Sequence, residues 1–476
     1  MKDVSAKILI SDIFLDESIY PRENIDHKRI GIFAENLRDG FVFEPIVVQV
    51  CPDPEIAAKK GKYRILDGVH RWSAYKKMGI TQIDVVIKTL NNIEPILYAA
   101  KMAIGPRQLT EAETRNTARR AFQANSRLTA SEIGRAIGRS RQAVDAYIAD
   151  LRATALFELD LKIFRLNQLG IPQDRIAKRL GVPQQTISRY LPKMPGLAKW
   201  VNSDLSKGFT VPQVAQKHGW PEPLVWSQAL VNKDDFSRFK ALQWGIRTWD
   251  VWNFMDCDNR FGDEWPGRIP AQLVAHILYF FSEPNDLVFD PMAGGGVCAD
   301  TCLAMGRRCW SLDMDDRPDT RPEIEPYYWD LKHEWENLPF FNAKEKPVLI
   351  ICDPPYFDKK AGEYAKESIS GLSKTDYLVF LERFFLFLKK TARKDAWLAF
   401  INADWRDFQN CPAKKEDPNQ AILLVDYYEM FKKTGWALTH IIQAPMSSER
   451  FNAGVVSAMQ KKKILGVISR YVMFLK

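Results

Sequence analysis

The chain contains 476 residues, of which 46% are hydrophobic, and carries a formal net charge of +8. This length predicts about three domains, each with enough apolar residues for a packed core. The first residues lack the apolar stretch of a signal peptide, and the apolar runs are too short or too interrupted to span a bilayer. We therefore expect a cytoplasmic protein without a membrane partner.

The basic excess is concentrated in one stretch of the chain. Residues 101–250 contain 24 Lys and Arg against 13 Asp and Glu, a surplus of 11 positive charges, and the remaining residues sum to −3. A stretch of this kind favours a polyanionic partner, although a basic solvated face is the plainer alternative. The seven cysteines form no CxxC pair and do not cluster with the six histidines along the sequence. We therefore expect no metal site and no disulfide framework.

Residues 1–105 alternate short β-rich runs with helical patterns, which predicts a small α/β domain. Within this domain, residues 66–74 read LDGVHRWSA after an apolar run at 45–48. A glycine between a strand and the amino terminus of a helix, with an arginine beside it, can hold a phosphate group. Gly68, His70 and Arg71 are therefore candidate phosphate- or nucleotide-binding residues.

This segment resembles the signature of the ParB and sulfiredoxin superfamily, with two departures. Val69 stands where sulfiredoxins carry their catalytic cysteine, which argues against reductase chemistry. Val69 and His70 together replace the Glu-Arg pair of CTP-binding ParB proteins. Nucleotide binding is therefore left open, and a structural role for His70 is the alternative.

Residues 106–240 lack strand patterns and read as short helices separated by Gly and Pro. Residues 128–148 and 171–190 each predict a helix, a glycine-bearing turn and a second helix with a polar start, and 209–230 form a weaker copy. This pattern is typical of helix-turn-helix motifs, whose second helix enters the major groove of DNA. Generic helical hairpins in a bundle are the alternative, most of all for the third copy. The candidate DNA contacts are Arg139, Arg141, Gln142, Gln184, Gln185 and Arg189.

The first of these copies also resembles the DNA-binding segment of ParB proteins. The likeness then covers residues 1 to about 150, in the order that this family uses. It implies double-stranded DNA, rather than RNA, as the partner.

Residues 241–476 predict a mostly parallel sheet with intervening helices and a terminal hairpin. A strand at 287–290 leads into a glycine turn and a helix, and the next strand ends at Asp313. The glycines allow backbone to approach a ligand, and Asp313 is placed to bind ribose hydroxyls. No Lys-Ser/Thr follows the glycines, and the dinucleotide fingerprint is incomplete. A nucleoside cofactor without a polyphosphate is therefore expected.

A second apolar run, at 347–352, ends in Asp353-Pro354-Pro355-Tyr356. It predicts a buried parallel strand that opens into a rigid loop at the ligand-binding edge of the sheet. A carboxylate and two carbonyl groups can accept hydrogen bonds from an exocyclic amine, and a tyrosine ring can stack on the attached base. The tetrapeptide therefore suits a flat heterocycle that bears an amino group.

Together these motifs resemble the S-adenosylmethionine-dependent DNA amino-methyltransferases, which modify adenine N6 or cytosine N4. The resemblance implies a Rossmann-like, doubly wound domain that acts on a flipped base, with Asp353 favouring adenine over cytosine. Met292 and Gly295 depart from the Phe and Ser that are usual or frequent in the family. The cofactor S-adenosyl-L-methionine would be bound by Asp290, Pro291, Ala293, Gly294, Gly296, Asp313 and Asp330. The catalytic residues would be Asp353, Pro354, Pro355 and Tyr356.

The sequence therefore predicts a multi-domain α/β protein: a ParB-like domain (1–105), a helix-turn-helix region (106–240) and a methyltransferase domain (241–476). The predicted function is site-specific DNA methylation, with site choice by the first two regions. The alternative is a ParB-like partition or transcription regulator with an inactive methyltransferase fold. The recognition sequence, a homodimer and a partner restriction enzyme are left open.

Overall fold

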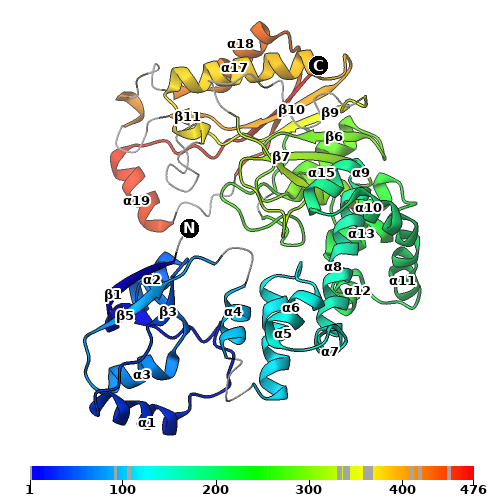
Figure 1. Ribbon diagram of the computed structural model, residues 1–476. Coiled ribbons are helices and arrows are strands. Elements are labelled where there is room, and N and C mark those ends of the chain that lie inside the picture. The colour runs from blue at the N-terminus through cyan, green and yellow to red at the C-terminus, as the bar shows by residue number, and fades with distance from the viewer. Residues whose placement is uncertain are drawn as a thin grey trace. The chain divides into compact units, whose positions relative to one another are not determined.

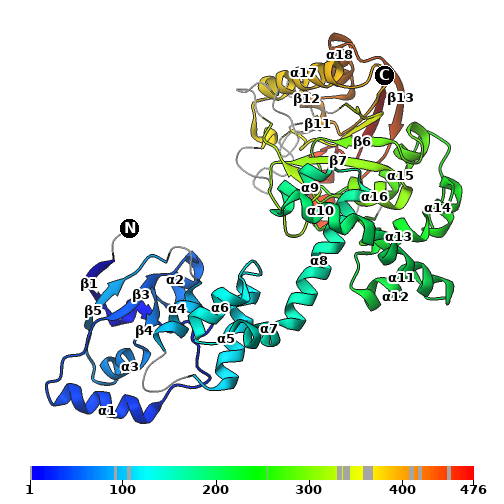
Figure 2. The ribbon, with the colours of Figure 1, turned by 45° about the vertical axis from the view of Figure 1, so that its right-hand side comes forward.

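The computed structural model describes residues 3–90, 94–103, 109–254, 256–329, 335, 344–357, 368–406, 412–415, 417, 421–446 and 452–476. It divides into two compact units, Met1–Leu159 and Asp160–Lys476, drawn in Figures 1 and 2. The boundary falls within one helix, α8 (Ala149–Gln168). Among the described helices, none combines the length and the apolar character that crossing a membrane requires.

The first unit contains the predicted small α/β domain. Its five-stranded sheet has the order β1-β5-β3-β4-β2, and Ile46 and Val48 of β3 are fully buried in its core. The strands are β1 (Val4–Leu9), β2 (Ile13–Phe14), β3 (Ile46–Val50), β4 (Tyr63–Asp67) and β5 (Gln82–Ile87). The helices are α1 (His27–Arg38), α2 (Pro54–Lys60), α3 (Val69–Lys77) and α4 (Pro95–Met102).

Three further helices complete this unit: α5 (Glu111–Ala124), α6 (Ala130–Ile137) and α7 (Arg141–Tyr147). The helices α6 and α7 form the first predicted hairpin. Thr129 and Glu132 cap the start of α6 with reciprocal hydrogen bonds, and Gly138 ends it with a φ of 67°, a conformation that favours glycine. Phe122 of α5 and Ile133 of α6 share a buried core with Leu66 of β4.

The predicted middle domain is therefore divided between the two units. The first hairpin shares its core with the N-terminal sheet, whereas the helices after α8 belong to the second unit. These are α9 (Gln173–Leu180), α10 (Gln184–Tyr190), α11 (Met194–Ser206), α12 (Val211–His218), α13 (Glu222–Ala229) and α14 (Asp235–Ala241). The sequence predicts one helical domain at 106–240, whereas the structure has two helical groups on two different cores.

The third predicted hairpin, α12 and α13, does not present a reading helix. Gly219 makes the expected turn with a φ of 67°, but residues 223–228 of α13 are all buried. They pack against α16 (Val297–Met305). A helix buried on every side cannot enter a DNA groove, so here the structure favours plain helical packing.

The second unit is built on a seven-stranded sheet of order β13-β14-β10-β9-β6-β7-β8. The strands β6 to β10 are parallel, and β14 runs antiparallel between β10 and β13, which confirms the predicted terminal hairpin. The strands are β6 (Leu287–Asp290), β7 (Arg308–Asp313), β8 (Ile324–Pro326), β9 (Leu349–Cys352), β10 (Trp397–Asn402), β13 (Leu438–Gln443) and β14 (Tyr471–Leu475). A separate small ribbon pairs β11 (Trp405–Arg406) with β12 (Ala421–Ile422).

Helices cover both faces of this sheet. The remaining ones are α15 (Ala271–Phe281), α17 (Lys374–Thr391), α18 (Leu424–Thr434) and α19 (Ala453–Lys462). Figure 2 shows α17 and α18 on one face and α15 and α16 on the other. All residues of β6 and β9 are buried, as expected for parallel strands that have helices on both sides.

Candidate active site

Two neighbouring strand ends define the site. The strands β6 and β9 run parallel, with Val288 opposite Leu349, so Asp290 and Asp353 stand at the same edge of the sheet. The chain leaves β6 towards β7 and β8 on one side and later returns to β9 on the other. A crevice forms where the strand order reverses in this way, and ligands bind in it. We name this side of the sheet the carboxyl edge.

The glycine turn after β6 brings bare backbone to the carboxyl edge. Gly294 and Gly296 have φ angles of 48° and 83°. A Cβ atom on Gly294 would lie 2.9 Å from the ring of Trp265, and one on Gly296 would lie 3.0 Å from the guanidinium of Arg321. The turn therefore needs glycine both for its dihedral angles and for space.

Three carboxyl groups gather at the carboxyl edge. Asp290 and Asp313 are buried, with 5% and 9% exposure, and Asp353 is partly exposed. Burial raises the pKa of Asp290 well above its ordinary value, and its negative neighbours, among them Asp313 and Asp353, add to the rise. Burial also raises the pKa of Asp313, against hydrogen bonds from the amides of Asp315 and Gly294. A positive charge at this edge would offset the repulsion that Asp290 receives from Asp313 and Asp353.

Asp313, the candidate ribose ligand, is hydrogen-bonded to the glycine turn. Its Oδ2 accepts a bond from the amide of Gly294 at 2.7 Å, and its Oδ1 accepts one from the amide of Asp315 at 3.1 Å. The amide of Ala293 donates to the carbonyl of Leu312 at 2.8 Å. The turn and the end of β7 are thus tied together. Each carboxylate oxygen has a further lone pair, so Asp313 can still accept a bond from a ligand hydroxyl.

The tetrapeptide after β9 is held by two tyrosines. The hydroxyl of Tyr356 donates to Oδ1 of Asp353 at 2.9 Å, and the hydroxyl of Tyr377 in α17 donates to the carbonyl of Pro355 at 3.2 Å. Pro354 between them is buried. The carboxyl group at the start of the tetrapeptide is therefore fixed in orientation. Tyr377 is a contributor that the sequence analysis does not name.

The carboxyl group of Asp353 has a pKa close to neutral pH. Burial raises its pKa to about 7, against the positive charge of Arg470 and the hydrogen bond from Tyr356. Arg470 directly precedes β14 and is itself buried. No sequence motif marks Arg470, which lies 117 residues after Asp353.

One expected part of the site, the candidate cofactor ligand Asp330, falls outside the described residues. The preceding residue, Trp329, is described, and its Nε1 donates to the carbonyl of Pro291 at 2.8 Å. The chain just before Asp330 therefore contacts the glycine turn.

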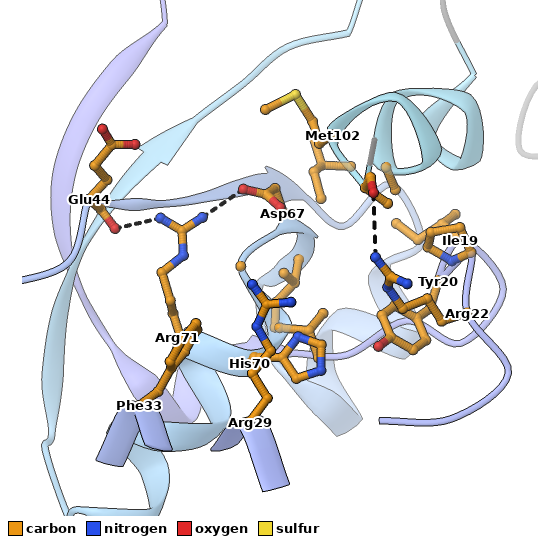
Figure 3. Close-up of a pocket in the computed structure, with 17 residues that line it drawn as sticks. Ile19, Tyr20, Arg22, Arg29, Phe33, Glu44, Asp67, His70, Arg71 and Met102 are labelled. Atoms are coloured by element: carbon orange, nitrogen blue, oxygen red, sulfur yellow. Dashed lines mark hydrogen bonds and ion pairs between the residues drawn. The ribbon is translucent and has the colours of Figure 1, made fainter. Parts of the chain in front are cut away.

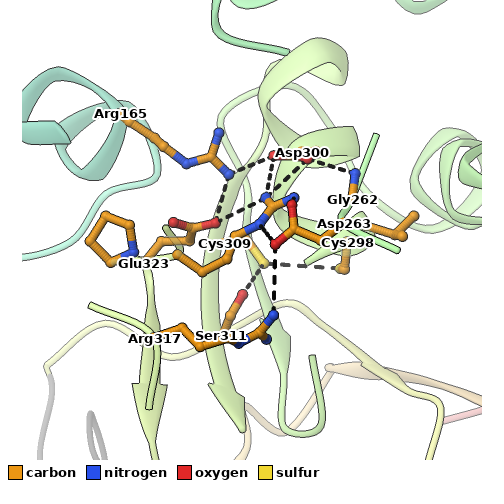
Figure 4. Close-up of polar contacts among 12 residues, drawn as sticks. Arg165, Gly262, Asp263, Cys298, Asp300, Cys309, Ser311, Arg317 and Glu323 are labelled. Carbon is orange, nitrogen blue, oxygen red and sulfur yellow. Dashed lines mark hydrogen bonds and ion pairs between the residues drawn. The ribbon is translucent and has the colours of Figure 1, made fainter. Parts of the chain in front are cut away.

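A buried network of charges lies behind the glycine turn (Figure 4). Asp300 of α16 accepts bonds from Arg165 at 2.5 Å, from Arg321 at 3.0 Å and from the amide of Gly262 at 2.7 Å. Glu323 accepts a further bond from Arg165 at 2.6 Å. Asp300 is 2% exposed and Glu323 is 1% exposed. The network joins α8, α16 and the chain before β8, and no local sequence pattern predicts it.

Three cysteines also meet beneath this turn. The thiols of Cys298 and Cys302, one helical turn apart in α16, lie within 4.8 Å of each other and of the thiol of Cys309 in β7. All three are buried. Linear spacing hides this grouping, because it arises only when α16 packs on β7. The thiol of Cys309 lies 4.0 Å from the thiol of Cys298 and 3.4 Å from the hydroxyl of Ser311, both within hydrogen-bonding distance.

The first unit contains a separate cavity of about 350 Å³, shown in Figure 3. Gly68, His70 and Arg71, the phosphate-binding candidates, all line it. Two further basic side chains, Arg22 and Arg29, line it as well. The structure thus brings the three predicted residues together and adds cations that the sequence analysis does not name.

Two of these candidates are held by neighbouring groups. Arg71 forms an ion pair with Asp67 at 2.6 Å, and Nε2 of His70 accepts a bond from the amide of Asp26 at 3.2 Å. Gly68 has a φ of 99° at the start of α3, so this turn requires glycine. The bond from Asp26 gives His70 a structural role, whatever else it binds.

The candidate DNA contacts of the first hairpin lie at the start of α7. Arg141 is 75% exposed and pairs with Asp145 at 3.4 Å, and Gln142 is exposed. Arg139 is more enclosed and pairs with Glu111 at 3.4 Å. The first two side chains can therefore reach a partner directly, whereas Arg139 is already engaged.

The second hairpin presents Gln184, Gln185 and Arg189 on the exposed side of α10. Its first helix, α9, is anchored to the sheet: Arg175 pairs with Glu325 at 2.7 Å, and Arg179 pairs with Asp316 at 2.5 Å. This hairpin is therefore attached to the same unit as the carboxyl edge.

Comparison with known protein families identifies two segments. Residues 2–101 match the ParB N-terminal domain, and residues 175–317 match the DNA methylase family. The second match contains the glycine turn and Asp313 and ends before Asp353. It begins at α9, so it includes the second hairpin.

Individual proteins resemble parts of the chain. Over 112 residues it is 31% identical to the nucleoid occlusion protein of Geobacillus sp. (strain WCH70), which covers 24% of this chain and 37% of that protein. Over 189 residues it is 27% identical to the nucleoid occlusion protein of Geobacillus thermodenitrificans (strain NG80-2), covering 36% and 63%. The chain thus spans less than two thirds of either relative.

Two solved structures show likeness at low identity. One is the truncated chromosome-partitioning protein ParB of Caulobacter crescentus complexed to the centromeric parS site, with 18% identity, a TM-score of 0.23, and coverage of 30% of this chain and 70% of that one. The other is the 1,6-didemethyltoxoflavin-N1-methyltransferase of Burkholderia thailandensis, with 11% identity, a TM-score of 0.25, and coverage of 43% and 76%. On the two family matches, the chain combines a ParB N-terminal domain with a domain of the DNA methylase family.

Proposed function

We propose that the protein is a site-specific DNA methyltransferase that methylates the exocyclic amine of a flipped base, with adenine N6 as the favoured target. The observation that carries this proposal is the position of Asp353 beside the glycine turn, at the edge where the strand order reverses. The match of residues 175–317 to the DNA methylase family supports it. A carboxylate for the amine and bare backbone for a cofactor then face one crevice.

The residues at the carboxyl edge fit S-adenosyl-L-methionine. The tight turn at Gly294 and Gly296 requires glycine at both positions, and Asp313 keeps lone pairs for ribose hydroxyls. The cofactor, when bound, supplies a methyl group on a positively charged sulfonium. A positive charge there would offset the repulsion that Asp290 receives from Asp313 and Asp353, which favours a ligand of that charge over a neutral one.

Asp353 would act on the base rather than on the cofactor. Its ionised carboxylate accepts a hydrogen bond from the exocyclic amine and increases the density of the nitrogen lone pair. Tyr356 and Tyr377 fix the loop in which Asp353 lies, so the acceptor is oriented before the base arrives. Positioning of this kind is a large part of catalysis when the electrophile is already activated.

The proposal predicts methyl transfer to duplex DNA by the full-length protein. Labelled S-adenosylmethionine and DNA free of amino-methylated bases are incubated with it, and the digested nucleosides are separated by mass spectrometry. We expect label in N6-methyladenine and none with Asp353→Ala. Label in N4-methylcytosine would overturn the adenine assignment alone. A folded, cofactor-binding protein that labels neither base would favour the alternative, a ParB-like regulator with an inactive methyltransferase fold.

Site choice would come from the exposed second helices of the first two hairpins. In α7, the double variant Arg141→Ala/Gln142→Ala removes two side chains that can reach base edges. Lost base contacts of this type reduce discrimination by roughly 10- to 100-fold each, so methylation should spread to related sites. Arg135→Ala, an exposed arginine on the first helix of the same hairpin, is the control. Sequencing that detects modified bases measures both, and an unchanged site pattern in the double variant would contradict the assignment.

A further inference from the structure

Two chain segments besides the tetrapeptide loop emerge at the carboxyl edge. Tyr471 at the start of β14 lies opposite Asn402 at the end of β10, and Gln443 at the end of β13 lies opposite Tyr471. The connection from β13 to β14, residues 444–470, therefore leaves and re-enters the sheet at the edge that carries Asp353. The connection from β10 to α18 starts there as well.

The β13–β14 connection is a hydrogen-bonded stem that carries a helix. The amides of Ala444 and Met446 donate to the carbonyls of Arg470 and Ile468 at 2.7 Å and 2.8 Å. The charge of Arg470, at the base of this stem, acts on Asp353. The stem is therefore fixed close to the candidate catalytic carboxylate.

The helix on this stem, α19, is held away from the core. None of its residues, 453–462, is buried, and Figure 1 shows it standing apart from the strands. Asn452 caps its start, accepting a bond from the amide of Val455 at 2.9 Å. A helix without a buried face is not retained for core packing, which points to a role at the surface.

Lysines from both connections meet at the end of α19. Lys461, Lys462 and Lys463 are all exposed. The carbonyl of Lys463 accepts a bond at 3.0 Å from the amide of Ala413 in the β10–α18 connection. The next two residues there, Lys414 and Lys415, are exposed as well. Over the full sequence of the two segments, 412–417 and 444–470, these five lysines and two arginines stand against three acidic residues, Glu416, Asp417 and Glu449.

Stabilisation of the end of a helix does not explain this cluster. Lysines in the last turn interact favourably with the helix dipole, which suits Lys461 and Lys462. It does not account for Lys414 and Lys415, which belong to another segment. We propose that these five lysines, the α19 basic surface, bind the phosphate backbone of duplex DNA beside the base that enters the carboxyl edge. This rests on the proposed function, and it gives the catalytic unit a DNA contact separate from the one proposed for the second hairpin.

The test compares two pairs of lysines at the ends of two helices. The variant Lys461→Gln/Lys462→Gln changes the last turn of α19, and the control Lys432→Gln/Lys433→Gln changes the last turn of α18. The control pair is also exposed, at 56% and 67%. It lies towards the opposite edge of the sheet, because α18 leads into the start of β13. A third variant, Lys414→Gln/Lys415→Gln, tests the other connection.

For the α19 pair and the 414/415 pair, we expect the KM for DNA to rise about tenfold at 0.15 M salt. Each lost phosphate contact should lower the salt slope of log KM by about 0.9. The kcat at saturating DNA and the dissociation constant for S-adenosylmethionine should stay at wild-type values, which also shows that the variants fold. The control should keep the wild-type KM and salt slope. Equal KM shifts in all three variants, or none, would overturn the proposal.

A wild-type protein without methyl transfer would refute the proposed function and not this surface. Fluorescence anisotropy of labelled duplex DNA with the full-length chain then measures the same lysines. Weaker binding of the α19 and 414/415 variants than of the control supports the α19 basic surface, and equal binding refutes it.

Discussion

Asp353→Asn is expected to slow methyl transfer strongly and, at the same time, to make the folded protein more stable at pH 8. The asparagine keeps the shape of the side chain, and its carbonyl oxygen can still accept the hydroxyl of Tyr356. It carries no negative charge, so it cannot draw a proton of the base amine towards itself. We expect the rate to fall roughly a thousandfold, measured as label transferred to DNA in a single turnover.

The gain in stability follows from the pKa of Asp353. Burial raises this pKa from 3.8 to about 7 in the folded protein. Between about pH 4 and pH 7 the folded state therefore keeps a proton that the unfolded state has released, and the free energy of unfolding falls as the pH rises. The whole shift corresponds to roughly 4 kcal/mol, and the partial exposure of Asp353 reduces the expected gain to about 2–3 kcal/mol.

The measurement is urea unfolding of wild type and variant at several pH values between about 5 and 8. The advantage of Asp353→Asn should grow up to about pH 7 and then stay constant. Asp395→Asn is the matched control, because the hydrogen bond from Arg393 lowers the pKa of Asp395 to about 2 and the expected sign is reversed. The difference in the free energy of unfolding between wild type and Asp353→Asn could instead be independent of pH, or the variant could be less stable than wild type at pH 8. Either result would show that burial does not raise the pKa of Asp353.

Asp300→Asn is expected to give the largest loss of stability in the second unit. Burial by itself would raise the pKa of Asp300, but Arg165 and Arg321 outweigh it and hold this pKa below its ordinary value. Removing the charge leaves two buried guanidinium groups with less compensation, which costs about 3–5 kcal/mol in comparable networks. Because Arg321 lies against Gly296, binding of S-adenosylmethionine should weaken as well.

The exposed pair of Glu429 and Lys432, 3.3 Å apart, provides the comparison. Glu429→Gln removes the same kind of charge from the surface and should change the free energy of unfolding by no more than about 0.5 kcal/mol. Urea unfolding and a cofactor titration measure both variants. Similar losses for Asp300 and Glu429 would mean that the buried network does not contribute to stability.

The elements that carry the site could be predicted because they are fully buried strands. Residues 287–290 and 347–352 are continuous apolar runs, and such runs are typical of parallel strands covered on both faces. The acid that ends each run then lies at the carboxyl edge by topology alone. The β-rich runs at 437–443 and 471–475 also predict the β13–β14 hairpin, although most residues of β13 are exposed.

Contacts between distant parts of the chain could not be predicted in this way. The partners in the network of Asp300 are 21 to 135 residues away from it. Arg470, likewise, lies 117 residues after Asp353. The division of the helical region was missed because a repeated helix–glycine–helix pattern does not reveal on which core each copy packs. For α13 a signal was present: residues 223–226, Pro-Leu-Val-Trp, are apolar in succession, which is typical of a buried helix rather than a reading helix.

The bond between Asp313 and Gly294 affects how experiments at this position must be interpreted. The aspartate expected to bind a sugar hydroxyl also restrains the turn on which that ligand would rest. Removing the carboxylate would therefore disturb two interactions at once, and the measured loss would exceed the value of either. A thermodynamic cycle that combines the substitution of Asp313 with a ligand lacking the sugar hydroxyl separates the two interactions. Only the coupling free energy of this cycle reports the bond between Asp313 and the hydroxyl.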